Sequence, residues 1–167
     1  LAMLLTDELD MRTTRRIQRL LRRASLGKEM TMETFDFAFN PSITAKRIKA
    51  LASCRFIERG EGIFLIGPTG TGKTHLATAL GVSGITRHSK RVRFYSTVDL
   101  ANLLEQEKAA GKAGRLAFGL MRLDLVILDE LGYMPLSQAG GALLFHLLSK
   151  LYEHTSVIIT TNLVFAE

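Results

Sequence analysis

A glycine-rich segment, residues 67–74, constrains this chain more than any other part of its sequence. It follows the apolar run 63–66 and leads into a helical pattern that begins at Lys73. Glycines let a backbone wrap closely around an anion, because no Cβ blocks the approach and successive N–H groups can point inward. The N-terminus of the following helix adds unsatisfied donors and partial positive charge. The pattern predicts a phosphate-binding loop between a strand and a helix.

The polar residues of this loop indicate which phosphate ligand it binds. Lys73 can reach β- and γ-phosphate oxygens, and the Thr74 hydroxyl can ligate Mg²⁺, which predicts a nucleoside triphosphate site. The predicted cofactor-binding residues are consecutive: Gly67, Pro68, Thr69, Gly70, Thr71, Gly72, Lys73, Thr74 and His75. His75, on the helix just after the loop, is also interpreted as a packing residue.

Two adjacent acids, Asp129 and Glu130, end the apolar run 125–128. A buried strand that ends in carboxylates is costly unless the carboxylates meet a cation. We expect Asp129 to hold Mg²⁺ opposite Thr74, and Glu130 to orient a water molecule for in-line attack on the γ-phosphorus. The alternative is a pair of acids that caps the turn before Gly132.

Apolar or β-branched runs alternate with helical patterns through the rest of the chain. The expected strands are 63–66, 92–96, 125–128 and 157–161. The expected helices are 42–59, with Ser42 as its N-cap, then 73–86, 97–108, 113–122 and 137–153. Continuous apolar runs indicate strands buried on both faces, and helical crossovers join parallel strands. The sequence therefore predicts an α/β fold, a three-layer αβα sandwich with a parallel sheet.

Asn162 directly follows the last expected strand. The carboxyl ends of parallel strands share one edge of a sheet, and ligands bind at that edge. We expect Asn162 to lie beside Asp129 and to hold the attacking water or a γ-phosphate oxygen. The alternative is an ordinary turn residue. The candidate catalytic residues are Glu130, Lys73 and Asn162.

The net charge of +6 is concentrated in residues 1–28. On a helix, six basic side chains of this segment share one arc: Arg12, Arg15, Arg16, Arg19, Arg22 and Arg23. The neighbouring arc is apolar and includes Leu20 and Leu21. The arginine arc is either a solvated face or a strip that binds nucleic-acid phosphates. Basic helices also bind acidic proteins and membrane surfaces.

Composition excludes several classes of protein. A single cysteine rules out a disulfide framework and a cysteine-based zinc site, so a cytoplasmic location is expected. The apolar runs are too short for a membrane-spanning helix, and the N-terminus lacks the order of a signal peptide. The chain begins without Met, and we interpret it as a piece of a longer protein, with a basic segment at 1–28 and a core at 29–167.

Taken together, these motifs resemble the AAA+ ATPases, a branch of the P-loop NTPases. The resemblance rests on the phosphate loop, on Asp129-Glu130 with the following run 131–135, and on the strand end 159–162. More narrowly the chain is similar to the IstB/DnaC group, the helper ATPases of bacterial insertion sequences and the helicase loaders. The run 93–100 and the connector 35–37 are similar to the IstB branch. The resemblance covers residues 10–167.

The resemblance implies an ATP-dependent homo-oligomer that binds duplex DNA, mainly through its backbone, and assists a transposase. Lys73 and Thr74 would serve the phosphates and Mg²⁺, Glu130 would be the base that activates water, and Asn162 would be the first sensor. The connector 37–43 would lie near the adenine. A helicase loader in DNA replication is the alternative function, and a small-molecule kinase is less favoured because no acceptor pocket is evident.

Relatives in this group continue to a fifth strand, an arginine finger and a helical lid, all of which would lie beyond Glu167. The strand at 63–66 should then be an exposed apolar edge. An arginine finger contributes roughly 10³–10⁵ in rate, so this chain alone should hydrolyse ATP weakly.

Overall fold

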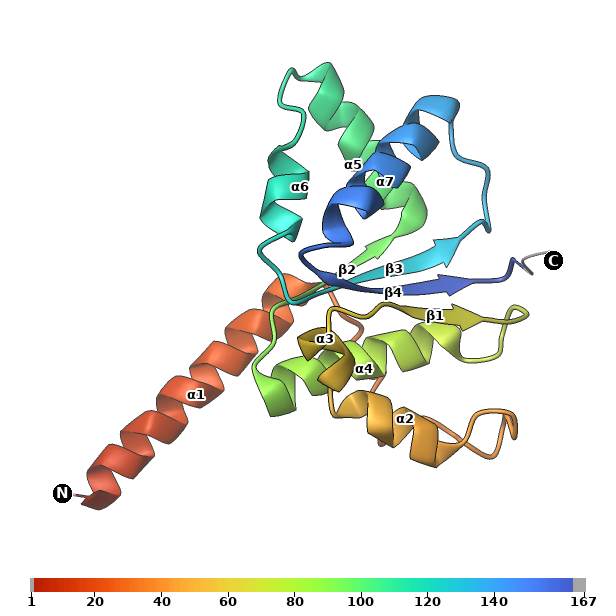
Figure 1. The fold of residues 1–167 in the computed structure, drawn as a ribbon. Coiled ribbons are helices and arrows are strands. Elements are labelled where there is room, and N and C mark those ends of the chain that lie inside the picture. Colours follow the sequence, from red (N-terminus) through yellow and green to blue (C-terminus); the bar gives the residue numbers. More distant parts are fainter. Residues whose placement is uncertain (1, 164–167) are drawn as a thin grey trace.

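The computed structural model describes residues 2–163 and shows a parallel sheet between two layers of helices (Figure 1). Within these residues the helices are α1 (Ala2–Ala24), α2 (Ala45–Ala52), α3 (Arg55–Glu58), α4 (Lys73–His88), α5 (Thr97–Ala109), α6 (Arg115–Leu120) and α7 (Gln138–Leu151). The strands are β1 (Ile63–Ile66), β2 (Val92–Ser96), β3 (Leu125–Leu131) and β4 (Ser156–Thr161).

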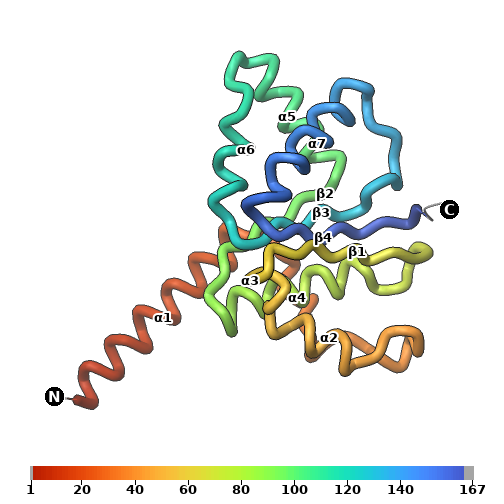
Figure 2. The backbone as a smooth tube through the Cα atoms, in the orientation of Figure 1, coloured from red at the N-terminus to blue at the C-terminus, as the bar shows by residue number. Residues whose placement is uncertain are grey.

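The strand order is β1-β4-β3-β2, and every pairing is parallel. One face of the sheet is covered by α4, with α2 and the C-terminal end of α1 packed on it (Figure 2). The other face is covered by α5, α6 and α7. The predicted three-layer αβα sandwich is therefore confirmed, and the bounds of β1 and β2 match the expected strands.

The sheet separates two hydrophobic cores. The core on the α4 side is centred on Leu80, Ile127 and Ile158, all fully buried. The core on the α7 side contains Leu128 and Leu147, which are also buried. Consecutive residues of β3 thus enter opposite cores, which explains why this strand is a continuous apolar run.

β1 departs from the expectation that every strand is buried on both faces. Its residues alternate in burial, and Phe64 and Ile66 are 55% and 49% exposed. Ile63 and Leu65 pack toward the α4-side core. Within the described residues β1 lies at an edge of the sheet, so the expected exposed apolar edge is confirmed.

The expected helix 42–59 is wrong as a single element. α2 ends at Ala52, and Cys54 adopts the left-handed conformation with φ 59° before α3 begins. Cys54 is buried and faces Gly84 of α4, so close packing overrides helical continuity at this point. Ser42 is not the N-cap either, because α2 begins at Ala45 and its N-cap residue is Thr44; the Ser42 hydroxyl donates to Asn40 Oδ1 at 2.6 Å instead.

An ion pair joins the starts of β2 and β3. Two Arg91 nitrogens, Nε and Nη2, donate to the Asp124 carboxylate at 3.1 Å each, and the Arg91 backbone N–H donates to it at 2.7 Å. Burial alone would raise the pKa of Asp124, but the hydrogen bonds from the Arg91 side chain and backbone lower this pKa overall. The same contacts raise the pKa of Arg91.

This ion pair predicts an acid-sensitive component of stability. The lowered pKa of Asp124 stabilises the fold above the ordinary value of 3.8, and that contribution is lost as pH falls through the lower folded pKa. Asp124→Asn should therefore lower the melting temperature at neutral pH and converge with wild type in acid. A difference in melting temperature that persists unchanged below that pKa would contradict the assignment.

Candidate functional site

The loop between β1 and α4 is shaped by glycines in a conformation that other residues rarely adopt. Gly70 has φ 78° and Gly72 has φ 89°, both in the left-handed region. Gly72 is the N-cap of α4, so the loop leads directly to the N-terminus of a helix. At the other end, the Gly67 N–H donates to Thr161 O at 3.2 Å and continues the pairing of β1 with β4. The backbone thus has the curvature of an anion-binding loop.

Lys73 lies inside this loop. It is 8% exposed, and Nζ donates to Gly67 O at 2.7 Å and to Pro68 O at 2.6 Å. The Tyr133 ring centroid lies 5.7 Å from the same Nζ. The ammonium charge is therefore held at the loop, where an anionic ligand would meet it.

Asp129 meets Thr74 as the sequence predicted. The Thr74 hydroxyl lies 3.0 Å from both carboxylate oxygens of Asp129, and Asp129 is buried. A hydroxyl and a carboxylate are hard oxygen donors of the kind that hold Mg²⁺ together with substrate phosphates. The two side chains thus fit a magnesium ion beside the phosphate loop. Within the described residues no group of three His, Cys, Asp or Glu side chains forms another metal site.

Thr160 completes this cluster and was missed by sequence reasoning. Its buried hydroxyl donates to Asp129 Oδ1 at 2.5 Å and accepts the Glu130 N–H at 2.8 Å. The signal that could have found it is a threonine near the end of an otherwise apolar strand that neighbours the acidic one. Only the register of β3 against β4 shows that this threonine lies beside Asp129, and the sequence does not give that register.

Glu130 lies on a β-bulge rather than beyond a strand tip. β3 continues to Leu131, and its pairing with β4 shifts register between Leu128 and Leu131. Glu130 has φ 62° and an exposed side chain, whereas the preceding Asp129 is buried. Bulges next to functional sites commonly redirect a side chain. This bulge sends the Glu130 side chain to the surface while Asp129 stays buried. The two carboxylates therefore have different environments.

Asn162 follows Thr161, the last residue of β4, and is exposed. Because Thr161 pairs with Leu131, Asn162 lies just beyond the carboxyl ends of β3 and β4. This is the sheet edge that also carries the acids. The contact of Asn162 with a water or a phosphate oxygen stays a prediction.

The connector before α2 is fastened to the phosphate loop by His75. The His75 Nε2 lies 2.9 Å from Thr31 O and 3.2 Å from Thr34 Oγ1. The imidazole also contacts the Phe35 ring edge-on, with centroids 5.2 Å apart. A Cβ at Gly72 would lie only 2.8 Å from the Phe35 ring. These contacts favour the packing interpretation of His75 and bring aromatic residues of the connector to the loop.

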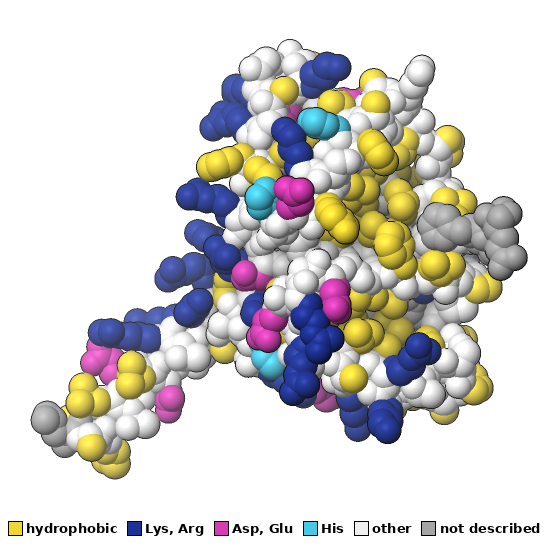
Figure 3. Space-filling model, in the orientation of Figure 1, with side chains coloured by type: hydrophobic (Ala, Val, Ile, Leu, Met, Phe, Trp, Pro, Cys, Tyr) yellow, Lys and Arg dark blue, Asp and Glu magenta, His cyan; other side chains and the backbone are white. Residues whose placement is uncertain are grey.

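The six arginines of α1 are all exposed, and Arg12 pairs with Glu8 at 2.5 Å. The C-terminal half of α1 packs through Leu20 and Leu21 onto the α4-side core. Figure 3 shows basic side chains along this helix and upward along the adjoining edge of the molecule. Among the described residues, no helix has the length and apolar character needed to cross a bilayer.

The parallel sheet and the glycine loop at the start of α4 define an α/β protein of the P-loop class. The family described as IstB-like ATP binding protein matches residues 1–167. The chain belongs to this family.

Curated relatives come from bacterial insertion sequences. The putative ATP-binding protein of insertion sequence IS21 from Pseudomonas aeruginosa is 39% identical over 167 residues, which are 100% of this chain and 63% of that protein. The corresponding IS5376 protein of Geobacillus stearothermophilus is 36% identical over 164 residues, with 98% and 65% covered. The chain thus spans less than two thirds of the length of these relatives.

Solved structures of replication proteins share the fold. AMPPCP-bound DnaA from Aquifex aeolicus superposes with a TM-score of 0.70 at 23% identity, covering 83% of this chain and 43% of DnaA. The DnaC helicase loader superposes with a TM-score of 0.66 at 26% identity, covering 84% of this chain and 82% of the loader. The fold is that of the AAA+ P-loop domains.

The role of Thr160 in the cluster predicts the effect of removing its hydroxyl. Thr160→Val leaves the Glu130 N–H without its acceptor, which should cost about 1–3 kcal/mol in the free energy of unfolding. Hydrogen exchange of the Glu130 amide should become faster. Thr160→Ser is the control, because it keeps the oxygen and should keep this amide protected. Equal protection in Thr160→Val would contradict the contact.

Proposed function

We propose that this chain is the ATP-binding part of an insertion-sequence helper ATPase, which hydrolyses ATP, binds DNA and assists a transposase. The observation that carries the ATPase proposal is the contact of Thr74 with the buried Asp129 beside the phosphate loop. The transposase is proposed as partner because the relatives are insertion-sequence proteins. The division into a basic segment (1–28) and an ATPase core (29–167), and a cytoplasmic location, are part of this proposal.

Nucleotide binding is assigned to residues 67–75. The backbone N–H groups around Gly70 and Gly72 would donate to phosphate oxygens, and Lys73 would neutralise their charge. Lys73 already lies within the loop, so its ammonium needs no long movement to meet a phosphate. His75 would act indirectly, by holding the connector against the loop.

Thr74 and Asp129 would hold the magnesium ion that accompanies ATP. The ion would supply charge neutralisation on the phosphate oxygens. The chain prepares this site by burying Asp129 and fixing its carboxylate with the hydroxyls of Thr74 and Thr160. Two oriented hydroxyls compensate for taking the carboxylate out of water.

Glu130 would accept the proton of the attacking water. Its exposed side chain and its backbone on the bulge separate it from Asp129, so the two acids can have different roles. Asn162, at the same sheet edge, would orient that water or a γ-phosphate oxygen. Its amide offers both a donor and an acceptor for this purpose.

DNA is the proposed macromolecular ligand of the α1 arginines. Six exposed guanidinium groups on one arc fit the phosphate backbone of a duplex better than a base-reading role. Homo-oligomerisation is proposed for the longer protein. A helicase-loading function has support from the DnaC superposition, and we rank it second because the curated relatives cited above are insertion-sequence proteins.

Substitutions in the site should separate binding from hydrolysis. Lys73→Gln should weaken ATP binding about 10- to 100-fold, the loss expected for charge-assisted hydrogen bonds of about 1.5–3 kcal/mol. Glu130→Gln should keep ATP affinity and slow hydrolysis by roughly 10²–10⁴, as removal of a general base does. Calorimetry measures the affinity, and single-turnover assays measure the slow hydrolysis.

The matched control is Glu153→Gln, which removes an exposed acid outside the site and should change neither quantity. If Lys73→Gln bound ATP as tightly as wild type, the nucleotide site would be assigned wrongly. If Glu130→Gln hydrolysed ATP at the wild-type rate, another group would be the base.

Replacing Arg15, Arg16, Arg19 and Arg22 with Gln should weaken duplex binding and leave ATP affinity unchanged. Each neutralised phosphate contributes about −0.9 to the slope of log K against log salt concentration, so the slope should become shallower. The control with the same charge loss replaces Lys46, Arg47, Lys49 and Arg55, which lie on α2 and α3. Unchanged DNA affinity in the α1 variant would favour an acidic protein partner for this helix.

A further inference from the structure

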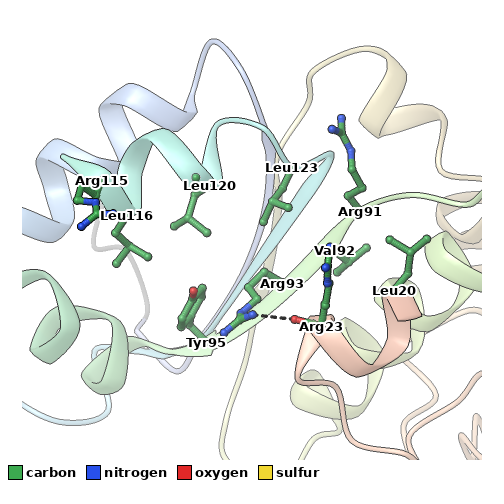
Figure 4. Close-up of a pocket in the computed structure, with 11 residues that line it drawn as sticks. Leu20, Arg23, Arg91, Val92, Arg93, Tyr95, Arg115, Leu116, Leu120 and Leu123 are labelled. Atoms are coloured by element: carbon green, nitrogen blue, oxygen red, sulfur yellow. Dashed lines mark hydrogen bonds between the residues drawn. The ribbon is translucent and has the colours of Figure 1, made fainter. Parts of the chain in front are cut away.

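A cavity of about 480 Å³ lies at the β2 edge of the sheet, between the C-terminal end of α1 and α6. Four arginines from three separate parts of the chain line it: Arg23 of α1, Arg91 and Arg93 at the start of β2, and Arg115 of α6. The remaining lining is largely leucine, together with Tyr95, and it contains no acidic side chain among the described residues. Figure 4 shows these side chains around the space between α1, β2 and α6, with the hydrogen bond from Arg93 to Arg23 dashed.

The cavity is distinct from the phosphate loop. Its floor includes Arg91 and Leu123, which precede β2 and β3 and so lie near the amino ends of the strands. The phosphate loop follows β1 at the carboxyl end of the sheet. β1 and β2 are also the two opposite edges of the described sheet. A ligand of this cavity is therefore not the nucleotide of the catalytic site.

The arginines of the cavity differ in what they contact. Asp124 engages Arg91 through two hydrogen bonds and neutralises it. Arg93 donates from Nη1 to Arg23 O at 2.9 Å and stacks 5.3 Å from the Tyr95 ring centroid. The Arg93 Nε is buried and has no hydrogen-bond partner among the described residues. Among residues 2–163, neither Arg23 nor Arg115 pairs with a carboxylate, and both side chains are exposed.

A buried guanidinium nitrogen without an acceptor is costly, because the lost hydration is not replaced. An anion in the cavity would neutralise the Arg93 guanidinium group, which pairs with no carboxylate among the described residues. Phosphate matches this donor set well, since the planar fork of arginine binds two phosphate oxygens at once. Arg93 is held in place by its stacking on Tyr95 and its bond to α1, so its fork is already oriented.

We propose that this cavity binds a backbone phosphate of duplex DNA, with Arg93 at its centre and Arg23 and Arg115 at its rim. The inference rests on the DNA binding proposed above and adds a specific phosphate site to it. Continuity of charge favours DNA over a free anion. Arg23 belongs both to the arginine arc of α1 and to the cavity. Basic side chains continue along this edge of the molecule from α1 toward α6 (Figure 3).

The experiment compares the affinity of wild type and variants for a short duplex over a range of salt concentrations. Arg93→Gln and Arg115→Gln should each weaken binding several-fold and make the slope of log K against log salt shallower by about 0.9 per lost phosphate contact. Arg93→Lys keeps the charge but lacks the fork, so it should retain the slope with intermediate affinity. Arg47→Gln, an exposed arginine on α2, is the matched control and should bind as wild type does.

The possible outcomes distinguish the proposed phosphate site in the cavity from the proposed binding of DNA by the chain. Arg115 is exposed, so Arg115→Gln keeps the test valid even if Arg93→Gln fails to fold, which thermal melting detects. If wild type binds the duplex and both cavity variants bind it equally well, the cavity proposal is overturned while DNA binding stands. A thermal shift with inorganic phosphate that is lost only in those variants would then assign the cavity to a free anion. If wild type binds no duplex, both proposals fail.

Discussion

The buried Asp129 carboxylate joins three elements of the fold, because it accepts hydrogen bonds from Thr74 on α4 and Thr160 on β4 while its own backbone lies in β3. These bonds attach the first turn of α4 to the carboxyl edge of the sheet, and they fix where the phosphate loop lies relative to the acids. Burial of the carboxylate is tolerated because two hydroxyls replace its hydration. The same oxygens are those that a magnesium ion would use, so stability and the proposed chemistry depend on one cluster.

The hydrophobic cores, the bulge in β3 and the connector before α2 surround this cluster and the phosphate loop. The two hydrophobic cores bury both faces of β3, at whose carboxyl end Asp129 is also buried. The bulge after Asp129 turns the Glu130 side chain to the surface, and the Glu130 N–H remains satisfied by Thr160. Phe35 of the connector packs close to Gly72 of the loop and against His75 of α4. The phosphate loop is thus held both by the sheet, through Gly67, and by the connector, through Phe35.

Much of the fold could be predicted from the sequence, because continuous apolar runs separated by helical patterns specify a parallel sheet. The strand bounds at 63–66 and 92–96 were predicted correctly. Thr74 and Asp129 lie together as expected, and their role as metal ligands stays a prediction. Features that depend on tertiary contacts were not. The break at Cys54 arises from packing against α4, the bulge at Glu130 arises from pairing with β4, and the role of Thr160 needs the strand register. The arginine cavity combines α1, β2 and α6, which no local pattern connects.

The most direct measurement is nuclear magnetic resonance of the labelled chain with ATP and Mn²⁺, a paramagnetic substitute for Mg²⁺. The account predicts that the backbone amides of Thr74 and Asp129 are broadened most strongly when nucleotide and metal are both present, while amides near the projecting N-terminal end of α1, such as that of Leu5, stay sharp. Asp129→Asn should abolish that broadening. Broadening centred elsewhere, or none at saturating nucleotide, would contradict the claim that these two residues hold the metal beside the phosphate loop.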